Sequence, residues 1–211
     1  MPKFDIHNDK TALLVIDMQN AWLRPGSPLE APNGRALIPD LNRLIQACRE
    51  KGIPIIFTRH AHRQDGSDMG LFKDFIPEMA TGSALIEGTP EVEIYGEMNH
   101  QKSDIVITKQ AYSAFYGTNL DLILRTKGID TLIIGGIITW ACCESTARDA
   151  RHRNYKVIFP SDGTATYDSL PDMGWGTIPA EESMRHVLTV MAFRYAEVLS
   201  IEEVLSRLSE S

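Results

Sequence analysis

The stretch "DTLIIGGIITWACCESTARDA", residues 130–150, changes character in its middle. Its first half is a continuous apolar run, which is typical of a strand buried on both faces of a parallel sheet. Two adjacent cysteines, Cys142 and Cys143, follow at the point where apolar residues take up helical spacing. A strand that leads through a turn into a helix is the unit of α/β folds. The stretch therefore predicts such a fold, and it leaves open which cysteine, if either, carries chemistry.

Further apolar runs of the same kind are spread along the chain, and helical patterns separate most of them. The runs are "TALLVI" (11–16), "IPIIFT" (53–58), "DIVITK" (104–109) and "YKVIFP" (155–160). Helical spacing covers 34–52, 117–128, 143–154 and 179–194, and the tail 196–211 indicates a last strand and a short helix. This order predicts a three-layer α/β/α, Rossmann-like fold with a mostly parallel six-stranded sheet. We find no linker or repeat and expect a single domain over 1–211.

Composition and charge narrow the class of function. The formal net charge is −7 and the basic residues are scattered, which argues against a nucleic-acid or membrane-surface partner. We see no signal peptide and no apolar stretch long enough to span a bilayer. The three cysteines are an odd number, and adjacent cysteines rarely bond each other. We therefore expect a cytoplasmic protein whose partner is a small-molecule substrate.

Three polar residues follow predicted strands at the edge where ligands bind in such sheets. Asp17 follows the run 11–16 and Lys109 ends the run 104–109. Cys142 follows the apolar first half of the stretch 130–150. A thiol at a helix start beside a lysine is activated towards the thiolate, and a carboxylate can accept and return its proton. With backbone N–H groups for an oxyanion, this set suits acyl transfer. The alternative is a helix start with two buried cysteines and a salt bridge between Asp17 and Lys109.

Three segments carry a resemblance to a known family. They are "LLVIDMQN" (13–20), "VITKQAYSAF" (106–115) and "GGIITWACCESTARDA" (135–150). In this order and spacing they resemble the isochorismatase-like cysteine hydrolases, which include nicotinamidases, N-carbamoylsarcosine amidohydrolase and ureidoacrylate amidohydrolase. The match spans most of the chain, and "KQAYSAFYGTNLDLILRTKGI" (109–129) is especially similar to the ureidoacrylate branch.

The resemblance implies an answer for the two cysteines. The family places its nucleophile at a fixed distance after a Gly and a Thr, and Gly136, Thr139 and Cys142 match these positions. Cys143 falls where the family usually has Val, so we interpret it as a packing residue. The family also implies a non-proline cis peptide bond immediately before Ile138. This bond would aim the Ile138 N–H, with that of Cys142, at the substrate oxygen as an oxyanion hole.

The implied reaction needs no redox or nucleotide cofactor. Asp17 takes the proton of Cys142 while Lys109 stays charged beside both, and the thiolate attacks an amide or ureido carbonyl. Protonated Asp17 passes its proton to the departing ammonia or amine, and water then hydrolyses the thioester. We therefore expect a cysteine-dependent amidohydrolase with an Asp-Lys-Cys triad that acts on a small amide, ureido or carbamoyl compound.

The substrate-binding residues follow by analogy with the family and from the irregular stretch 59–103, which is long for a plain loop and suits a lid or binding surface. Trp140 departs from the smaller residue that the family often has at its position. Gln19 is expected to orient Asp17 or to cap the turn, and the loop 167–175 to reach the site or a partner subunit. The substrate-binding candidates are Gln19, Trp22, His62, Tyr112, Phe115 and Trp140.

Two histidines raise the alternative of a metal site. On an extended segment, His60 and His62 point the same way, as a metal pair would. Metal-binding nicotinamidases carry Asp-x-His here and a further His downstream, whereas this chain has His60 at the Asp position and no His in 67–83. We therefore expect no metal. Arg59, Arg63 and His62 are instead candidates to bind a substrate carboxylate, which Arg binds in a bidentate manner.

Two other functions remain as alternatives. One is another hydrolase of the same fold, a nicotinamidase or an isochorismatase-type enzyme, although true isochorismatases lack the cysteine. The other is a non-catalytic scaffold or a thiol redox sensor that uses Cys142 and Cys143. Family habit further implies a homodimer or homotetramer.

Overall fold

A parallel sheet forms the centre of the computed structural model, which describes residues 3–210. Its strands lie in the order β3-β2-β1-β4-β5-β9, every neighbouring pair is parallel, and a short β6 (Thr164–Ala165) adds to β4. The bounds are β1 Thr11–Ile16, β2 Ile55–His60, β3 Ile105–Lys109, β4 Thr131–Ile137, β5 Lys156–Pro160 and β9 Glu197–Leu199. The predicted α/β fold and its six-stranded sheet are confirmed, and β6 is an addition to the prediction.

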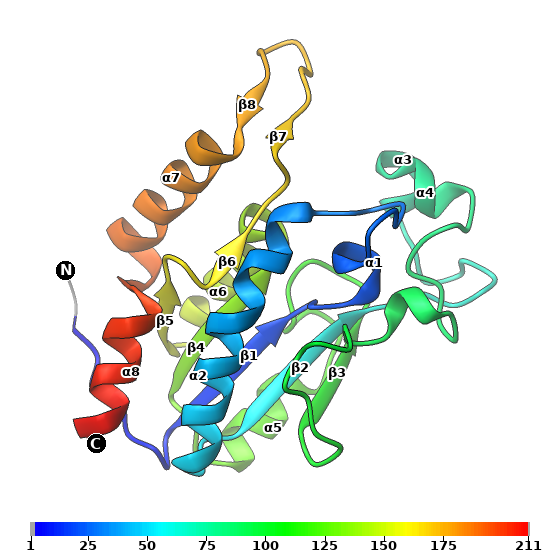
Figure 1. The fold of residues 1–211 in the computed structure, drawn as a ribbon. Helices are drawn as coiled ribbons and strands as arrows, with labels where there is room; N and C mark the ends of the chain where they lie inside the picture. The colour runs from blue at the N-terminus through cyan, green and yellow to red at the C-terminus, as the bar shows by residue number, and fades with distance from the viewer. Residues whose placement is uncertain (1–2, 211) are drawn as a thin grey trace.

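Helices cover both faces of the sheet, because successive strand residues point to opposite sides. In β1, Leu13 and Val15 pack into the cluster formed with α2 and α8, whereas Leu14 and Ile16 pack towards α5, α6 and α7. Figure 1 shows α2 and α8 in front of the sheet and α5 and α6 behind it. The bounds are α2 Ile38–Glu50, α5 Leu120–Thr126, α6 Glu144–His152, α7 Ala180–Val190 and α8 Ile201–Glu210. Strands buried on both faces explain the continuous apolar runs.

The second strand begins and ends two residues later than the predicted 53–58. Pro54 has no N–H to give to a ladder, and the N–H of Ile53 donates to the carbonyl of Cys48 at the end of α2. At the other end the strand continues to His60, which pairs with Lys109 of β3. The shift carries His60 to the carboxyl edge of the sheet.

All four predicted helices are shorter than their apolar patterns, and two of them are accompanied by a turn of another helical type. The first is divided into a 3₁₀ turn, Pro32–Leu37, and α2, with Pro39 in the first turn of the α-helix, where a missing N–H costs nothing. The predicted helix 179–194 is observed as α7 followed by a π-helical turn, Met191–Tyr195, before β9. The other two predicted helices lie within their predicted ranges, as α5 and α6.

Two segments stand away from the sheet (Figure 1). The irregular stretch after β2 forms a lobe with the short helices α3 (Phe72–Phe75) and α4 (Pro77–Ala80), followed by a 3₁₀ turn at Pro90–Val92. A hairpin of β7 (Ser169–Leu170) and β8 (Ile178–Pro179) projects from the body, and its tip exposes 93% of Trp175. The expected homodimer or homotetramer stays a prediction. Within residues 3–210, none of the helices has both the length and the apolar character needed to span a bilayer.

Two glycines allow β4 to pass close to its neighbours. A Cβ on Gly136 would lie 2.1 Å from the carbonyl oxygen of Ile16, and its φ is +124°. A Cβ on Gly135 would lie 2.9 Å from the carbonyl oxygen of Gly163. Real Cβ atoms do not approach backbone this closely, so glycine is required here. The close approach holds the end of β4 against the end of β1, just before Asp17.

We expect Gly136→Ala to lower the free energy of unfolding by at least about 3 kcal/mol, because the added methyl group clashes with backbone. Gly128→Ala is the matched control, since Gly128 also has a positive φ (+72°) but nothing lies within 4 Å of its Cβ position. It should cost about 1–2 kcal/mol. Urea unfolding followed by circular dichroism measures both. Equal losses in the two variants would contradict the close-approach argument.

Candidate active site

Three strand ends bring Asp17, Lys109 and Cys142 together, as the sequence predicts. The ammonium of Lys109 lies 2.7 Å from Asp17 Oδ2 and 3.2 Å from Cys142 Sγ. The carboxylate and the thiol are within 4.8 Å of each other. Neighbouring strands β1 and β4 bring Asp17 and Cys142 together, and the long side chain of Lys109 reaches them from beyond β2. All three side chains are buried, so their charges interact with little screening.

Asp17 is held in a left-handed backbone conformation, with φ +47°. Residues other than glycine rarely adopt it, and it occurs where surrounding contacts impose it, often at functional sites. Here Thr58 of β2 makes two such contacts. Its hydroxyl donates to Asp17 Oδ1 at 2.6 Å and accepts from the Asp17 N–H at 3.1 Å. These bonds fix one carboxylate oxygen and leave Oδ2 facing the ammonium and the thiol.

The turn after β4 has the predicted cis peptide bond between Ile137 and Ile138. It leads into a π-helical turn, Thr139–Cys143, that continues directly as α6. The carbonyl of Ile138 accepts bonds from the N–H groups of Ala141 and Cys143, which closes the turn. Ile138 and Cys142 both line the cavity described below.

Burial dominates the ionisation of the thiol. Desolvation raises the pKa of Cys142 to about 12, although the positive charge of Lys109 opposes it. Burial alone would lower the pKa of Lys109, but the negative charges of Asp17 and Cys142 outweigh it and raise that pKa. The sequence suggested a thiol activated towards the thiolate in the free protein. The structure instead favours a neutral thiol beside a carboxylate–ammonium pair.

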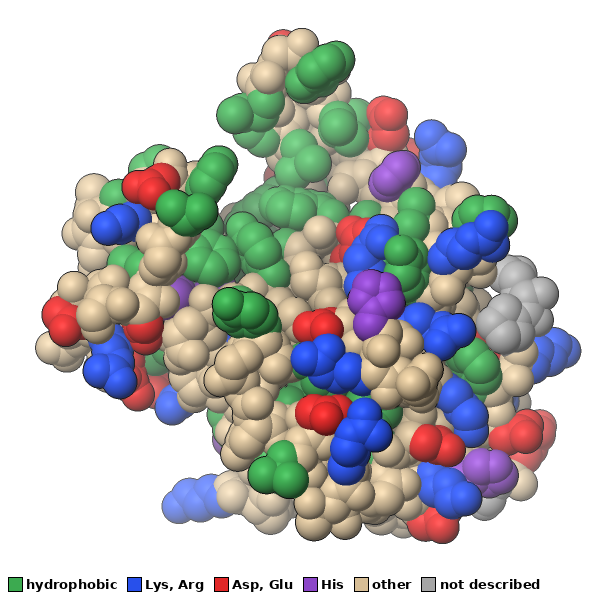
Figure 2. Space-filling model, turned by 180° about the vertical axis from the view of Figure 1, so that it is seen from behind, with side chains coloured by type: hydrophobic (Ala, Val, Ile, Leu, Met, Phe, Trp, Pro, Cys, Tyr) green, Lys and Arg blue, Asp and Glu red, His purple; other side chains and the backbone are tan. Residues whose placement is uncertain are grey.

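A cavity of about 470 Å³ opens on the thiol. Its walls come from the turn after β4, from α1 (Asn20–Leu23), from the lobe and from the base of the hairpin. Figure 2 shows hydrophobic side chains gathered in the hollow between the lobe and the projecting hairpin. The predicted contribution of 59–103 and of the loop 167–175 to a binding surface agrees with this lining, through Phe75, Ile76, Glu78 and Tyr167.

Half of the predicted substrate-binding side chains line this cavity. Trp22, Tyr112 and Trp140 do so, and the indole N–H of Trp140 donates to Thr166 Oγ1 at 2.6 Å. Phe115 does not, because it packs in the core behind the sheet against Tyr155. Its place in the sequence close to Lys109 suggested otherwise, but the chain turns away after Tyr112.

Gln19 is also absent from the cavity wall and does not bond the side chain of Asp17. Its amide nitrogen donates to the carbonyls of His60 and Val92, and its oxygen accepts from the His60 N–H. Gln19 thus ties the end of β1 to the end of β2 and to the lobe. Thr58, instead of Gln19, holds the carboxylate of Asp17. The one sequence signal for this role is the position of Thr58 near the end of a neighbouring strand.

His60 lines the cavity, and its Nε2 lies 2.9 Å from Nε2 of the buried His62. Desolvation, with the nearby charge of Lys109, lowers the pKa of His60 well below its usual range, so the ring is neutral. His62 does not line the cavity, and its Nδ1 faces Asp68 at 3.4 Å. Among residues 3–210, the potential metal-ligand cluster is Asp17, His60 and Cys142. The ammonium of Lys109 already provides the positive charge between two of them.

The arginines proposed for a substrate carboxylate lie elsewhere. Arg59 donates to Thr108 Oγ1 at 2.9 Å and faces Glu93 at 3.6 Å. Neither Arg59 nor Arg63 lines the cavity. Side chains in β2 alternate in direction, so the segment presents His60 to the cavity and turns Arg59 away. The expected carboxylate site at Arg59, Arg63 and His62 is therefore not part of this cavity wall and stays a prediction.

A comparison with known protein families matches residues 11–203 to the isochorismatase domain. The chain belongs to the isochorismatase family. The expectation of an enzyme, a hydrolase of the amidohydrolase type, is confirmed at the level of this family.

Individual relatives agree with the family assignment. The chain is 31% identical to nicotinamidase 3 of Arabidopsis thaliana, over 96% of this chain and 90% of the relative. It is 33% identical to a ureidoacrylate amidohydrolase of Variovorax paradoxus, over 75% and 70% of the two chains. A crystal structure of a cysteine hydrolase from Pseudomonas syringae superposes with a TM-score of 0.95 at 35% identity, covering 99% and 96%.

We expect Lys109→Met to lower the free energy of unfolding by about 3–5 kcal/mol, because it leaves the buried carboxylate of Asp17 without its partner. The double variant Asp17→Asn/Lys109→Met removes both charges and should recover at least about 1 kcal/mol of that loss. Urea unfolding of the wild type, both single variants and the double variant closes the cycle. A double variant no more stable than Lys109→Met would show that the buried pair is not the source of the loss.

Alkylation of Cys142 in the free protein should rise about tenfold per pH unit between pH 7 and 10. A pKa raised to about 12 means that the thiol is protonated throughout this range and that each unit of pH adds tenfold thiolate. Iodoacetamide labelling followed by mass spectrometry measures the rate, and Cys142→Ser supplies the background from Cys48 and Cys143. A plateau below pH 9 would contradict the dominance of burial.

Proposed function

We propose that this protein is a cysteine-dependent amidohydrolase that cleaves the carbon–nitrogen bond of a small amide, ureido or carbamoyl compound through a thioester. The observation that carries the proposal is the position of Cys142. Its thiol lies at the wall of the cavity, 3.2 Å from the ammonium of Lys109 and within 4.8 Å of the Asp17 carboxylate. A nucleophile, a base and a fixed cation thus meet where a substrate carbonyl has room.

The first half of the reaction moves a proton within the buried group. The thiol proton passes to Asp17, and Oδ2 is the oxygen to receive it, because Oδ1 already accepts from Thr58 whereas Oδ2 is held by its ionic contact with Lys109. Before the transfer the charges are Asp17⁻ and Lys109⁺, and afterwards they are Cys142⁻ and Lys109⁺. The net charge of the group stays at zero, which makes the step feasible despite the burial of the thiol.

The thiolate then attacks the carbonyl carbon, and a C–S bond forms as the carbonyl electrons move to oxygen. The N–H groups of Ile138 and Cys142 are the proposed donors to this oxyanion. The oxyanion collapses, the C–N bond breaks, and Asp17 gives its proton to the departing ammonia or amine. Water, deprotonated by Asp17, finally attacks the thioester carbonyl, the C–S bond breaks and the acid product leaves, and Asp17 returns the proton to the Cys142 thiolate.

The burial of Cys143 supports a hydrolase better than it supports a thiol redox sensor that uses both cysteines. Cys143 has no exposed surface, and its burial raises its pKa well above the ordinary value. A sensor thiol instead needs thiolate character and access to oxidants. Cys143 packs in the core behind the sheet, beside Ala147 and Ala150 of α6, so we propose that it only fills space there.

We expect Cys142→Ser to lower kcat/KM at least about a thousandfold, because a serine hydroxyl is far less acidic than a thiol and a carboxylate such as Asp17 is too weak a base to activate it. Ammonia release from nicotinamide, ureidoacrylate, N-carbamoyl amino acids, biuret, maleamate and simple alkyl amides is the measurement. Cys143→Ala is the matched control and should keep kcat/KM within about tenfold, because it removes only a packed sulfur.

The substrate that turns over best defines the branch of the family. Equal losses in the two cysteine variants, with both still folded, would assign the chemistry to something other than Cys142. Full turnover in Cys142→Ser would reject the thioester mechanism.

A further inference from the structure

The wall of the cavity is rich in aromatic rings and carries charge of one sign. Trp22, Phe75, Tyr112, Trp140 and Tyr167 all line it. Its acidic side chains are Glu30 and Glu78, and no Lys or Arg among residues 3–210 takes part in the lining. Aromatic faces and carboxylates both attract cations, so the composition of the wall favours a positively charged ligand over a negatively charged one.

Most of the remaining charge around the cavity cancels. Asp17 and Lys109 neutralise each other, and His60 stays neutral because burial lowers its pKa. Glu30 is paired with Arg35 at 2.7 Å and also accepts the N–H of Gly26. What remains is Glu78, for which the described part of the chain provides no ion pair.

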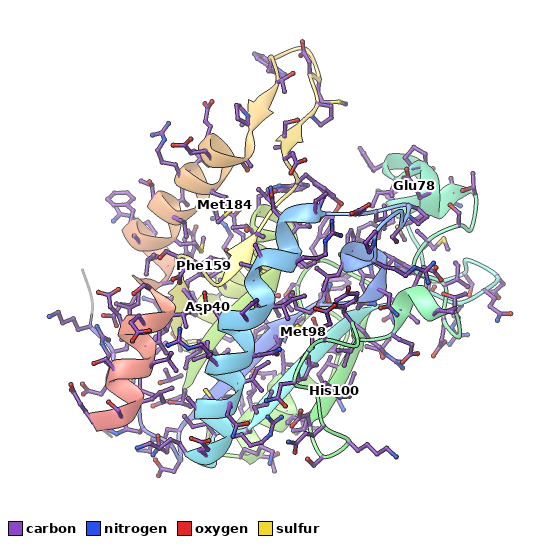
Figure 3. The ribbon with its side chains drawn as sticks, in the orientation of Figure 1. Asp40, Glu78, Met98, His100, Phe159 and Met184 are labelled. Carbon is purple, nitrogen blue, oxygen red and sulfur yellow. The ribbon has the colours of Figure 1, made fainter. Side chains whose placement is uncertain are left out.

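Glu78 lies on α4, in the lobe (Figure 3). Its side chain and that of Tyr167 line the same cavity. Burial, followed by the negative charges of Cys142 and Glu78, raises the pKa of Tyr167. The lobe and the hairpin base therefore place one carboxylate and one neutral aromatic ring around the same opening.

We propose that the substrate carries a cationic group, such as an alkylated or quaternary ammonium, at the end remote from the scissile amide. The amide carbonyl lies at Cys142, and the cation lies among the aromatic rings, facing Glu78. This substrate class rests on the proposed amidohydrolase function. It excludes substrates with a carboxylate at that end, because such a group would face Glu78 and find no cation in the wall.

Three amides of equal chain length test the charge preference. 4-(Trimethylammonio)butanamide is the cation, 5,5-dimethylhexanamide is its neutral isostere, and glutaramate carries a carboxylate at the same place. Binding is measured by calorimetry on Cys142→Ala, which holds the ligand without cleaving it, and kcat/KM by ammonia release from the wild type. The cation should bind more tightly than glutaramate, and higher ionic strength should weaken its binding.

Glu78→Gln supplies the decisive comparison. It should lower the ratio of cation to neutral-isostere affinity by about 2- to 5-fold, with the affinity for the neutral amide unchanged. Asp74→Asn is the matched control, since Asp74 lies on α3 of the same lobe but does not line the cavity. It should leave the ratio unchanged.

The two proposals fail separately. A ratio within twofold of the wild type in Glu78→Gln, or glutaramate binding as tightly as the cation, would overturn the cationic substrate class even if amides are hydrolysed. Absence of ammonia release from every amide, with the charge preference intact in the calorimetry, would instead overturn the amidohydrolase function and leave a site for cationic ligands.

Discussion

The ion pair between Asp17 and Lys109 is the constraint around which the rest of this molecule is arranged. Both side chains are fully buried, and their 2.7 Å contact offsets a desolvation cost of several kcal/mol for each charge. The ammonium also donates to the carbonyl of Ala111 and contacts the thiol of Cys142. A pair held in this way provides a fixed pair of charges at the sheet edge.

The fold supports that pair with backbone as much as with side chains. Gly136 lets β4 approach β1, so that the strand ends carrying Cys142 and Asp17 become neighbours. Thr58 fixes the carboxylate from β2, and Gln19 joins the end of β1 to the end of β2. Positions that carry no chemistry therefore determine the distances between those that do.

The proposed reacting groups and the cavity wall come from different parts of the chain. Asp17 follows β1, Lys109 ends the edge strand β3, Cys142 lies in the turn after β4, and all three side chains are buried, which leaves them little freedom. The cavity wall comes largely from the lobe around α4 and from the hairpin base, which pack outside the sheet.

Local sequence was sufficient to predict the sheet, its helices and the three residues at its carboxyl edge. Buried strands need continuous apolar runs, and a polar residue directly after such a run can only lie at the edge. The choice of Cys142 over Cys143 and the cis peptide bond before Ile138 came from the resemblance to the family. Only the tertiary structure showed that burial keeps the Cys142 thiol protonated, because desolvation depends on everything packed around it.

The cavity wall could be predicted only in part from the sequence. Phe115 and Gln19 lie close in sequence to reacting residues, yet one packs in the core and the other bonds backbone. Glu78 lies far from them in sequence, yet lines the cavity. Side chains in irregular segments have no period that sets their direction, so their place is decided by how the loops pack. The sequence by itself determined the fold and which polar residues lie at the carboxyl edge of its sheet, and the packing of loops on that fold decided which side chains line the cavity.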